Sequence, residues 1–376
     1  MPSAKQPLRI LHLTCRLDGY GGASMLRSLA VSQAAAGERV VVAPLLAEKL
    51  PVNALRDQSV VVQPLGGRWP IDVIALTRLA RLRRQLAANV THAWDVRSLA
   101  LAAMSGRRRP GHILIGSLLA IGDARRWTER VLRTMHSRVT AFTVPEEAAC
   151  ERLTQLGVAA NRIHVIPPGV SRRGSGEAEP ARASLLKELK LPNDAKLIAV
   201  AGPLGRHRQV EEAIWAYELV RVMYPAARLL VVGDGADRMR LERFAEQVSE
   251  PGCVRFLGYR DDWQSLLPGL DVFWQLNASV TTPLALLEAG AAGVPAVASD
   301  IPAHRAAVIQ DRTGLLAKLG DRAETVRATE ELLLNQPKAH RLGQAAAELV
   351  AERWSLDATL GAFDRLYERL VHAPAP

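Results

Sequence analysis

The stretch VTTPLALLEAGAAGVPAVASD, residues 280–300, predicts how the second half of the chain folds. Its Ala- and Leu-rich part, residues 284–292, has the composition of a helix, and Gly293 ends that helix. The apolar run 295–299 is short and bounded by turn residues, which is typical of a buried strand. A turn, a helix and a strand in this order place backbone amides and the positive end of a helix dipole at one point, which favours an anionic ligand.

Glu288 is the only charged residue of the predicted helix, one helical turn after its start. A carboxylate among Leu286, Leu287 and Ala289 needs a hydrogen-bond partner, and a hydroxyl group of a bound ligand is one candidate. The alternative is that Glu288 lies on the solvated side of an ordinary helix. The stretch alone leaves both interpretations open.

The length and composition indicate two ordinary globular domains. The chain has 376 residues, 48% hydrophobic and 23% charged. Its three cysteines, Cys15, Cys150 and Cys253, have no paired spacing, which argues against zinc and disulfides and fits a reducing compartment. Because the first residues show no signal-peptide pattern and no apolar run of about 20 residues occurs, we expect a cytoplasmic protein.

The net charge of +10 is concentrated in the first half of the chain. Residues 1–170 carry 23 Lys and Arg against 11 Asp and Glu, and the remainder has a slight negative balance. Basic residues gather at 77–88, 106–110 and 124–138. They form either a solvated helix face or a surface for an anionic acceptor or the inner face of a membrane, where each contributes about 1 kcal/mol. We expect no nucleic-acid binding, because aromatic residues for stacking are scarce there.

The order of predicted elements indicates an α/β fold with parallel sheets. A strand at 8–14, a Gly-rich turn with a helix, and a strand at 39–43 form an opening βαβ unit. Gly19, Gly21 and Gly22 follow the first strand, at the edge where such sheets bind ligands, although glycines can also serve the turn alone.

The second half repeats this alternation from a strand at 196–201 onward. We therefore predict two βαβ-type domains facing a cleft. The first covers residues 1–170, the second 171–355, and a helix at 356–376 closes the chain. The polar stretch 171–184 is predicted to be the linker.

Several segments now combine into one pattern. They are GYGGAS (19–24), VTHAWD (90–95), RIHVIPPGV (162–170), LLVVGDGADRMRLERFA (229–245), VRFLGYRDD (254–262) and PLALLEAGAAGVPAVASD (283–300). In this order and spacing the chain resembles the retaining glycosyltransferases of family 4, which have two Rossmann-like domains in the GT-B fold. The last helix resembles the family's terminal segment, which crosses back to pack on the first domain.

The resemblance implies a nucleotide-sugar donor held mainly by the second domain and an acceptor on the first. The Glu288 carboxylate would accept hydrogen bonds from the donor ribose, and amides at the start of its helix would face the diphosphate. The implied donor-binding residues are Gly21, Gly22, Arg206, Arg208, Gly233, Asp234, Gly235, Leu257, Gly258, Tyr259, Thr281, Thr282, Leu284, Ala285, Leu286 and Glu288.

The resemblance also implies a hexosyl-type transferase that uses neither a metal nor a cofactor. Cationic groups and amides would offset the charge that develops on the leaving diphosphate, and the configuration at the sugar would be retained. Arg208 occupies the position of the family's lysine, and we also consider His92 and Asp95 as catalytic residues. By its position alone, His92 is better explained as a strand-end residue.

Three residues depart from the family pattern. Val280 replaces the first glutamate of the motif, Pro203 replaces an arginine, and Trp94 replaces a histidine. Each loss is worth about 1.5–3 kcal/mol, which together would slow transfer roughly 10³- to 10⁶-fold unless neighbours such as Arg206 compensate. From the resemblance as a whole we expect a transferase acting on a glycan or lipid-linked acceptor. The alternative is a catalytically impaired relative that binds a nucleotide or sugar, or regulates a partner.

Overall fold

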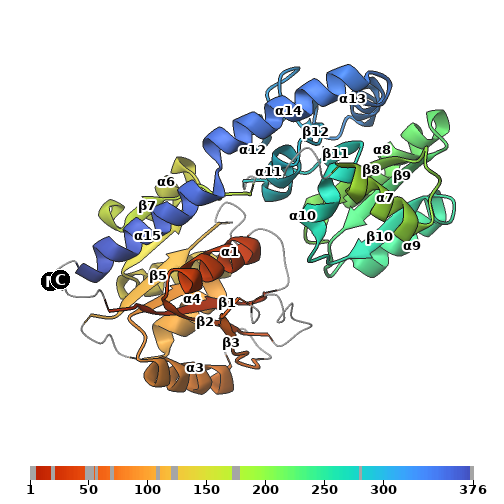
Figure 1. Ribbon diagram of the computed structural model, residues 1–376. Coiled ribbons are helices and arrows are strands. Elements are labelled where there is room, and N and C mark those ends of the chain that lie inside the picture. Colours follow the sequence, from red (N-terminus) through yellow and green to blue (C-terminus); the bar gives the residue numbers. More distant parts are fainter. Residues whose placement is uncertain are drawn as a thin grey trace. The chain divides into compact units, whose positions relative to one another are not determined.

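The computed structural model describes residues 6–17, 22–46, 55, 58–67, 72–106, 111–119, 126–171, 178–278 and 282–372. The chain divides into two compact units, each of which is described by itself. Unit 1 comprises Met1–Gly169 together with Asp357–Pro376, and unit 2 comprises Val170–Leu356. Both are Rossmann-like layers of parallel strands and helices (Figure 1), so the predicted fold class is confirmed.

Unit 1 contains a sheet in the order β3-β2-β1-β4-β5-β6-β7, and every neighbouring pair is parallel. The strand order reverses between β1 and β4, which is where a sheet of this kind opens its ligand crevice. The strands are β1 (Arg9–Thr14), β2 (Arg39–Pro44), β3 (Val61–Val62), β4 (Val90–Ala93), β5 (Ile113–Ser117), β6 (Ala141–Val144) and β7 (Ile163–Val165).

Helices cover both faces of this sheet, because alternate residues of its strands are apolar and buried on opposite sides. Leu11 and Leu13 belong to the core under α3, α4, α5 and α6, whereas Ile10 belongs to the core under α1 and α15. The helices of unit 1 are α1 (Gly22–Ala35), α3 (Val73–Leu86), α4 (Val96–Met104), α5 (Arg126–Met135), α6 (Glu147–Gln155) and α15 (Leu356–His372), with short turns η1 (His136–Arg138) and η2 (Ala160–Arg162).

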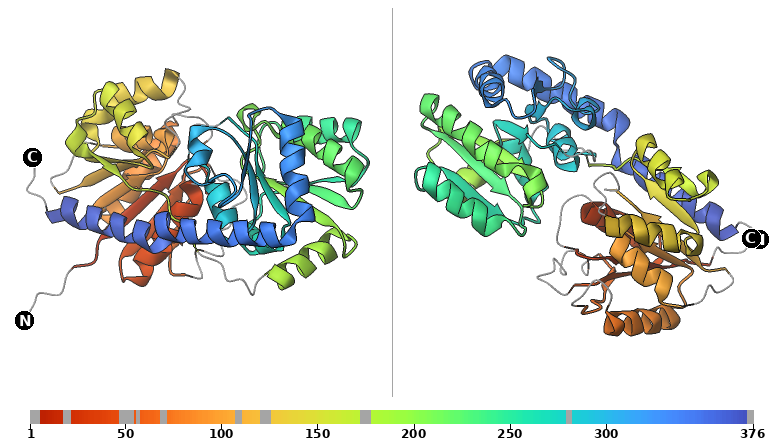
Figure 2. Two further views of the ribbon diagram at one scale, coloured as in Figure 1. Left: turned by 90° about the horizontal axis from the view of Figure 1, so that it is seen from above. Right: turned by 180° about the vertical axis from the view of Figure 1, so that it is seen from behind.

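Unit 2 contains a second parallel sheet in the order β10-β9-β8-β11-β12-β13. Its strand order reverses between β8 and β11, so the ligand edge is expected beyond the carboxyl ends of these two strands. The strands are β8 (Lys196–Ala201), β9 (Ala227–Val232), β10 (Val254–Gly258), β11 (Val272–Gln275), β12 (Ala296–Ser299) and β13 (Leu315–Ala317). Figure 2 shows both layered units from two further sides.

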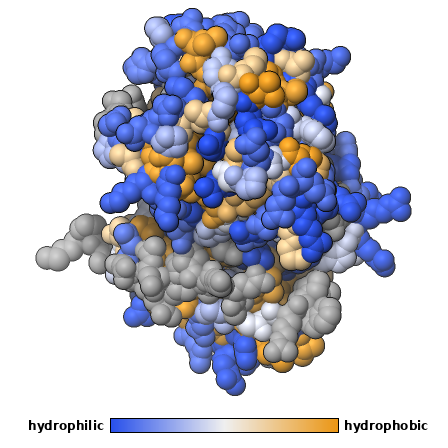
Figure 3. All heavy atoms as spheres, turned by 90° about the vertical axis from the view of Figure 1, so that its right-hand side faces the viewer, coloured by the Kyte–Doolittle hydropathy of each residue, from blue (hydrophilic) through white to orange (hydrophobic). Residues whose placement is uncertain are grey.

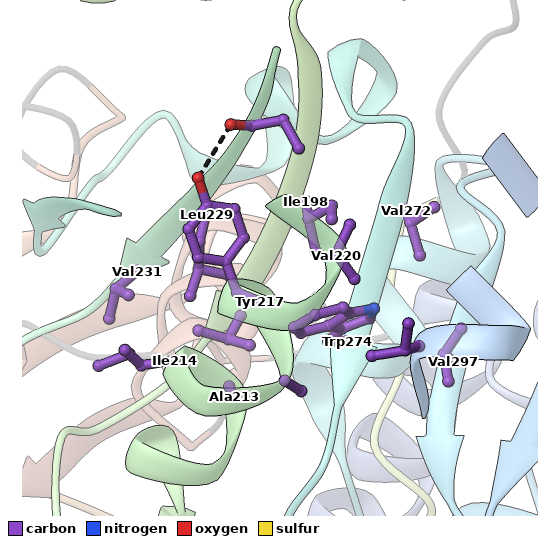
Figure 4. Packing of buried hydrophobic residues seen from close by; sticks show 14 of the residues in the cluster. Ile198, Ala213, Ile214, Tyr217, Val220, Leu229, Val231, Val272, Trp274 and Val297 are labelled. Carbon is purple, nitrogen blue, oxygen red and sulfur yellow. Dashed lines mark hydrogen bonds between the residues drawn. The ribbon is translucent and has the colours of Figure 1, made fainter. Parts of the chain in front are cut away.

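The helices of unit 2 enclose a core that contains the large aromatic residues Tyr217 and Trp274 (Figure 4). The Tyr217 hydroxyl donates to the Ala227 carbonyl at 2.9 Å, and Trp274 Nε1 donates to Thr329 Oγ1 at 2.9 Å. The helices are α7 (Ala178–Leu189), α8 (Val210–Met223), α9 (Arg238–Val248), α10 (Trp263–Leu266), α11 (Leu284–Ala291), α12 (Pro302–Arg305), α13 (Arg322–Leu334) and α14 (Gln336–Arg353), with short turns η4 (Arg206–Arg208) and η5 (Leu267–Gly269).

The outer face of α8 carries exposed apolar residues, among them Trp215, Leu219 and Val222. Phe244 packs edge-on against Trp215 with ring centroids 5.6 Å apart, and the Arg322 guanidinium lies 5.5 Å from the Trp215 ring. Figure 3 views the molecule from the side of unit 2 that bears α8 and α9, and apolar patches alternate there with hydrophilic residues. Among the described residues, no helix is long and apolar enough to cross a membrane.

The predicted linker 171–184 is wrong in its second half. Helix α7 begins at Ala178, and Ala181 is buried. Arg182 donates to Asp271 Oδ2 at 2.8 Å and to the Ala195 carbonyl at 2.6 Å. The polar residues of this stretch are therefore the outer face and anchor of a unit 2 helix.

Candidate functional site

The loops that follow β8, β9 and β10 meet at the carboxyl edge of the unit 2 sheet. The Gly202 amide donates to the Val232 carbonyl at 2.9 Å, and the Gly233 amide donates to the Gly258 carbonyl at 2.8 Å. The Leu204 amide donates to the Asp234 carbonyl, also at 2.9 Å. Backbone hydrogen bonds thus join the three loops into one surface beside the strand-order reversal.

Two glycines permit this close approach. A β-carbon on Gly233 would lie 2.0 Å from the Gly202 carbonyl oxygen, and its φ of +134° is unfavourable for other residues. A β-carbon on Gly235 would lie 2.2 Å from the Leu204 carbonyl oxygen. Both contacts are far shorter than van der Waals distance, so these positions require glycine for loop packing.

Arg208 lies at the centre of this edge. Its guanidinium carbon is 3.8 Å from the position that a β-carbon on Gly202 would take, an ordinary van der Waals distance, so Arg208 lies directly beside the Gly202 loop. A small cavity of about 20 Å³ beside it is lined by Gly202, Pro203, Leu204, Arg208 and Asn277, among others. Arg206 is in the same short turn, η4, and is exposed. Two cationic side chains therefore lie next to the carboxyl end of β8.

His304 is a residue that the sequence analysis missed at the same edge. It is fully buried in α12, and its ring shares a 2.9 Å hydrogen bond between Nδ1 and the Ser299 carbonyl. Since a carbonyl only accepts, Nδ1 carries the proton. Burial, reinforced by the charge of Arg208, lowers the pKa of His304 to about 4. A neutral imidazole therefore stands near Arg208, and no motif in the sequence marks it.

Glu288 lies in α11 with only 5% of its surface exposed, so the solvated-helix interpretation is wrong. Its Oε2 accepts a hydrogen bond from Trp263 Nε1 at 3.2 Å, and its Oε1 accepts one from Gln264 Nε2 at 3.1 Å. The carboxylate thus has partners within unit 2, and the argument that it needs a ligand hydroxyl does not hold. A carboxylate has about four acceptor positions, so it can accept from several donors at once.

The start of α11 carries no side-chain cap. Pro283 is the N-cap residue and makes no side-chain hydrogen bond to the first turn. The predicted phosphate-facing residues Leu284, Ala285 and Leu286 form that turn, and Thr282 lies just before it. Thr281 and Val280 lie outside the described residues. Within this turn the Leu284 amide donates to the Thr282 carbonyl at 3.0 Å and the Leu286 amide donates to the Pro283 carbonyl at 2.9 Å, so these two predicted phosphate contacts are already engaged. The positive end of the helix dipole still favours an anion here.

The remaining predicted donor residues of unit 2 lie at the same edge of the sheet. Asp234 Oδ1 accepts from the Gly235 amide at 2.7 Å, and Oδ2 accepts from Arg238 at 3.1 Å, so this carboxylate stiffens its turn. Leu257 and Gly258 end β10, and Tyr259 follows half-buried. The structure therefore brings these residues together with Arg206 and Arg208.

In unit 1, His92 lies inside the core. It is fully buried, with Nδ1 2.6 Å from the Tyr367 hydroxyl of α15 and Nε2 2.6 Å from Ser117 Oγ. Burial and the neighbouring His12 lower its pKa well below the usual range. Both ring nitrogens are thus engaged within unit 1, and a catalytic role for His92 stays a prediction.

Trp94, which departs from the family pattern, has a structural role in the same core. Its Nε1 donates to His12 Nδ1 at 3.1 Å, and its ring stacks on His92 with centroids 4.4 Å apart. Because the indole only donates, His12 must carry its proton on Nε2, which bonds to Gln33 Oε1 at 2.8 Å. The tryptophan therefore joins β4 to a buried hydrogen-bonded chain.

Asp95 caps the helix that follows β4. Its Oδ1 accepts from the Ser98 amide at 2.9 Å in a capping box, and its Oδ2 accepts from the Cys15 amide at 2.6 Å. Gly22 begins α1, and its predicted partner Gly21 lies outside the described residues. Asp95 thus orders the β1 and β4 ends of unit 1, and its catalytic role also stays a prediction.

Matches to known protein families agree with this geometry. Residues 20–173 match the model described as Glycosyltransferase Family 4, and residues 182–349 match the model described as Glycosyl transferases group 1. The two matches are consecutive and together span most of the chain. The chain therefore belongs to this family of glycosyltransferases.

Individual relatives cover nearly the full length. The lipopolysaccharide core biosynthesis glycosyltransferase LpsE of Rhizobium meliloti (strain 1021) is 26% identical, over 84% of this chain and 92% of its own. LpsD of the same organism is 23% identical, over 85% of this chain and 93% of its own.

Solved structures show the same fold. Anabaena HepE in complex with UDP and glucose superposes with a TM-score of 0.80 at 16% identity, covering 96% of this chain and 99% of its own. Sucrose-phosphate synthase from Thermosynechococcus elongatus has a TM-score of 0.78 at 18% identity, over 97% and 100%. These likenesses confirm the GT-B architecture.

Proposed function

We propose that the protein is a hexosyl-type glycosyltransferase whose unit 2 holds a nucleotide-sugar donor. The observation that carries the proposal is the joining of three loops at the carboxyl edge of unit 2, beside Arg206 and Arg208. The uncapped start of α11 and the buried Glu288 belong to the same unit. HepE, which shares the fold, was solved with UDP and glucose.

In this proposal each group has one task. Arg206, Arg208 and the positive end of the α11 helix dipole bind the diphosphate and offset the charge that develops on it when the sugar leaves, without a metal. Glu288 accepts hydrogen bonds from the ribose hydroxyls. Transfer proceeds with retention, and the leaving phosphate takes the proton of the acceptor hydroxyl.

We propose a glycan or lipid-linked acceptor. LpsE and LpsD, which cover nearly the whole chain, are described as acting in lipopolysaccharide core biosynthesis. The proposed acceptor class rests on the names of these two relatives. The described side chains of unit 1 show no pattern that specifies a sugar.

One observation favours the alternative of an impaired, binding-only relative. Trp94 occupies a position where the family has a histidine, and its ring is buried against His92 and His12. A donor-binding protein without turnover would keep the unit 2 site and lack transfer.

Release of nucleotide from its sugar separates the two functions. The purified chain would be incubated with UDP-, GDP-, ADP- and dTDP-hexoses and with glycan or lipid-linked acceptors, and free nucleoside diphosphate would be measured. We expect acceptor-dependent release with one donor, reduced about 10- to 150-fold in Arg208→Met because a charge-assisted contact is lost. Donor binding without release for any acceptor would contradict transfer and favour the alternative.

We also propose that unit 1 associates with anionic membranes. Its basic helices α3 and α5 both pack beside α4 on one face of the sheet. Val73 and Ile74 at the start of α3 are 71% and 57% exposed, and Trp127 of α5 is 39% exposed. Apolar residues beside arginines suit an interfacial surface.

Liposome sedimentation tests this association. We expect binding to vesicles that contain anionic lipid, weaker binding as the ionic strength rises, and little binding to neutral vesicles. Equal sedimentation with both kinds of vesicle at low salt would mean that these helices present an ordinary solvated face.

A further inference from the structure

We propose that helix α10 positions the Glu288 carboxylate for the ribose of the donor, with Trp263 and Gln264 as the positioning residues. The inference rests on the proposed function, because it concerns the same nucleotide site. Its test is therefore arranged so that failure of the positioning and failure of the site give different results.

The two contacts fix the carboxylate in its plane. Trp263 Nε1 donates to Oε2 at 3.2 Å, and Gln264 Nε2 donates to Oε1 at 3.1 Å. Because each oxygen accepts from a side chain of α10, rotation of the carboxylate about its last side-chain bond would break both contacts. The indole can only donate, which leaves Oε2 as an acceptor.

The donors themselves are held in place. Trp263 is 2% exposed and packs against Phe273 of β11, with ring centroids 6.2 Å apart. The start of α10 is pinned by Arg260, which donates to Asp262 Oδ2 at 2.7 Å and to Glu188 Oε2 at 3.1 Å. The carboxylate is therefore oriented by a rigid support that continues into the strand next to the strand-order reversal.

This arrangement gives the Glu288 carboxylate a defined orientation as an acceptor. About four acceptor positions belong to a carboxylate, and the two α10 donors are neutral. Neutral donors orient the group without cancelling its charge, and hydrogen bonds to a charged acceptor are stronger than those between neutral groups. A carboxylate held in this way suits the two adjacent hydroxyls of a ribose, which point in nearly the same direction.

The chain also connects α10 to the rest of the predicted nucleotide site. Gly258 ends β10, where the family resemblance places the base, and Tyr259 to Asp262 lead directly into Trp263. The same short segment thus runs from the predicted base contact to the supports of the predicted ribose contact.

Discrimination between ribose and 2′-deoxyribose provides the test. Calorimetry would measure the affinities of UDP, GDP and ADP and of their 2′-deoxy counterparts for the full chain. For the base that binds, we expect the wild type to prefer the ribonucleotide roughly 10-fold or more. Gln264→Met and Trp263→Phe should reduce this preference at least 3-fold, by weakening ribonucleotide binding while deoxynucleotide binding changes little.

Gln247→Met is the matched control, since Gln247 is exposed on α9 of the same unit, and it should keep the wild-type preference. A purely structural role of α10 would weaken both nucleotides equally and leave their ratio unchanged, which would overturn the positioning proposal. If Trp263→Phe does not fold, the Gln264→Met variant still tests the positioning, because Gln264 is only half-buried.

Glu288→Ala distinguishes failure of the positioning by α10 from failure of the ribose contact itself. We expect it to abolish the preference for ribose. Loss of the preference in Glu288→Ala but not in the α10 variants would refute positioning and leave the nucleotide site intact. An unchanged preference in Glu288→Ala would refute the ribose contact, and failure of every nucleotide to bind the wild type would refute the proposed function.

Discussion

Substitution of Gly235 by alanine should loosen the loops that hold the unit 2 site. The new β-carbon would lie 2.2 Å from the Leu204 carbonyl oxygen, whereas an ordinary contact is at least 3.4 Å, so the Leu204 segment has to move by more than about 1 Å. That segment is fixed by the Leu204 amide, which donates to the Asp234 carbonyl at 2.9 Å, and by the Asp237 amide, which donates to the Leu204 carbonyl at 3.2 Å. Losing both bonds costs about 1–3 kcal/mol.

Gly320→Ala provides the matched control in the same unit. Gly320 has a φ of +79° and nothing within 4 Å of its added β-carbon, so this variant suffers only the left-handed backbone penalty of about 1–2 kcal/mol. Calorimetry of the full chain would measure the unfolding of both variants, and titration would measure their nucleotide affinity.

We expect both variants to be less stable than the wild type, and only Gly235→Ala to lose nucleotide affinity, because Leu204 leads directly to Arg206 and Arg208. The reasoning is refuted if Gly235→Ala binds nucleotide as tightly as Gly320→Ala does.

Three further predictions concern unit 1. Tyr367→Phe removes the 2.6 Å partner of the buried His92 and should lower stability by about 1–3 kcal/mol, measured by urea unfolding; an unchanged midpoint would show that this bond does not hold α15. Burial lowers the pKa of His12 from 6.5 to about 4 in the folded state. As the pH falls, His12 is therefore protonated in the unfolded chain before it is protonated in the folded one, and the free energy of unfolding should drop by about 2 kcal/mol between pH 7 and pH 5. That part of the drop should be missing in His12→Gln, and an identical pH dependence in both proteins would contradict it. Asp95→Ala should cost about 1–2 kcal/mol through the lost cap, with nucleotide affinity unchanged in a titration; weaker nucleotide binding would indicate a direct role instead.

The sequence allows the elements of unit 2 to be predicted where local signals are strong. The helix expected at 284–292 is α11, Leu284–Ala291, and the strand expected at 295–299 is β12, Ala296–Ser299. Ala and Leu favour helix, and Gly293, with a φ of +73°, marks the end of the turn. Such signals act over a few residues and can be found without knowledge of the fold.

Contacts between distant residues could not be predicted in this way. Glu288 reads as a lone carboxylate because its partners Trp263 and Gln264 come from another helix, more than 20 residues earlier. The polar stretch around Arg182 resembles a linker because its partner Asp271 is far along the chain. In both cases the hydrogen-bond partner is distant in the sequence, so the local sequence does not reveal it.

Unit 1 illustrates the same limit for function. Trp94 reads as a lost catalytic group, but its indole donates to His12 and its ring stacks on His92. Only the structure shows that Tyr367, at the other end of the chain, completes this cluster. His304 lacks any motif, and only its burial and its proximity to Arg208 draw attention to it.

The most direct test of a nucleotide site in unit 2 is thermal unfolding with UDP, GDP, ADP and dTDP, for the wild type and for Arg208→Met. A ligand at 100 times its Kd stabilises the folded state by about 2.7 kcal/mol, which shifts the Tm by several degrees. We predict a clear shift with one base, reduced or lost at the same concentration in Arg208→Met. No shift with any nucleotide at millimolar concentration, or an equal shift in both proteins, would contradict the account.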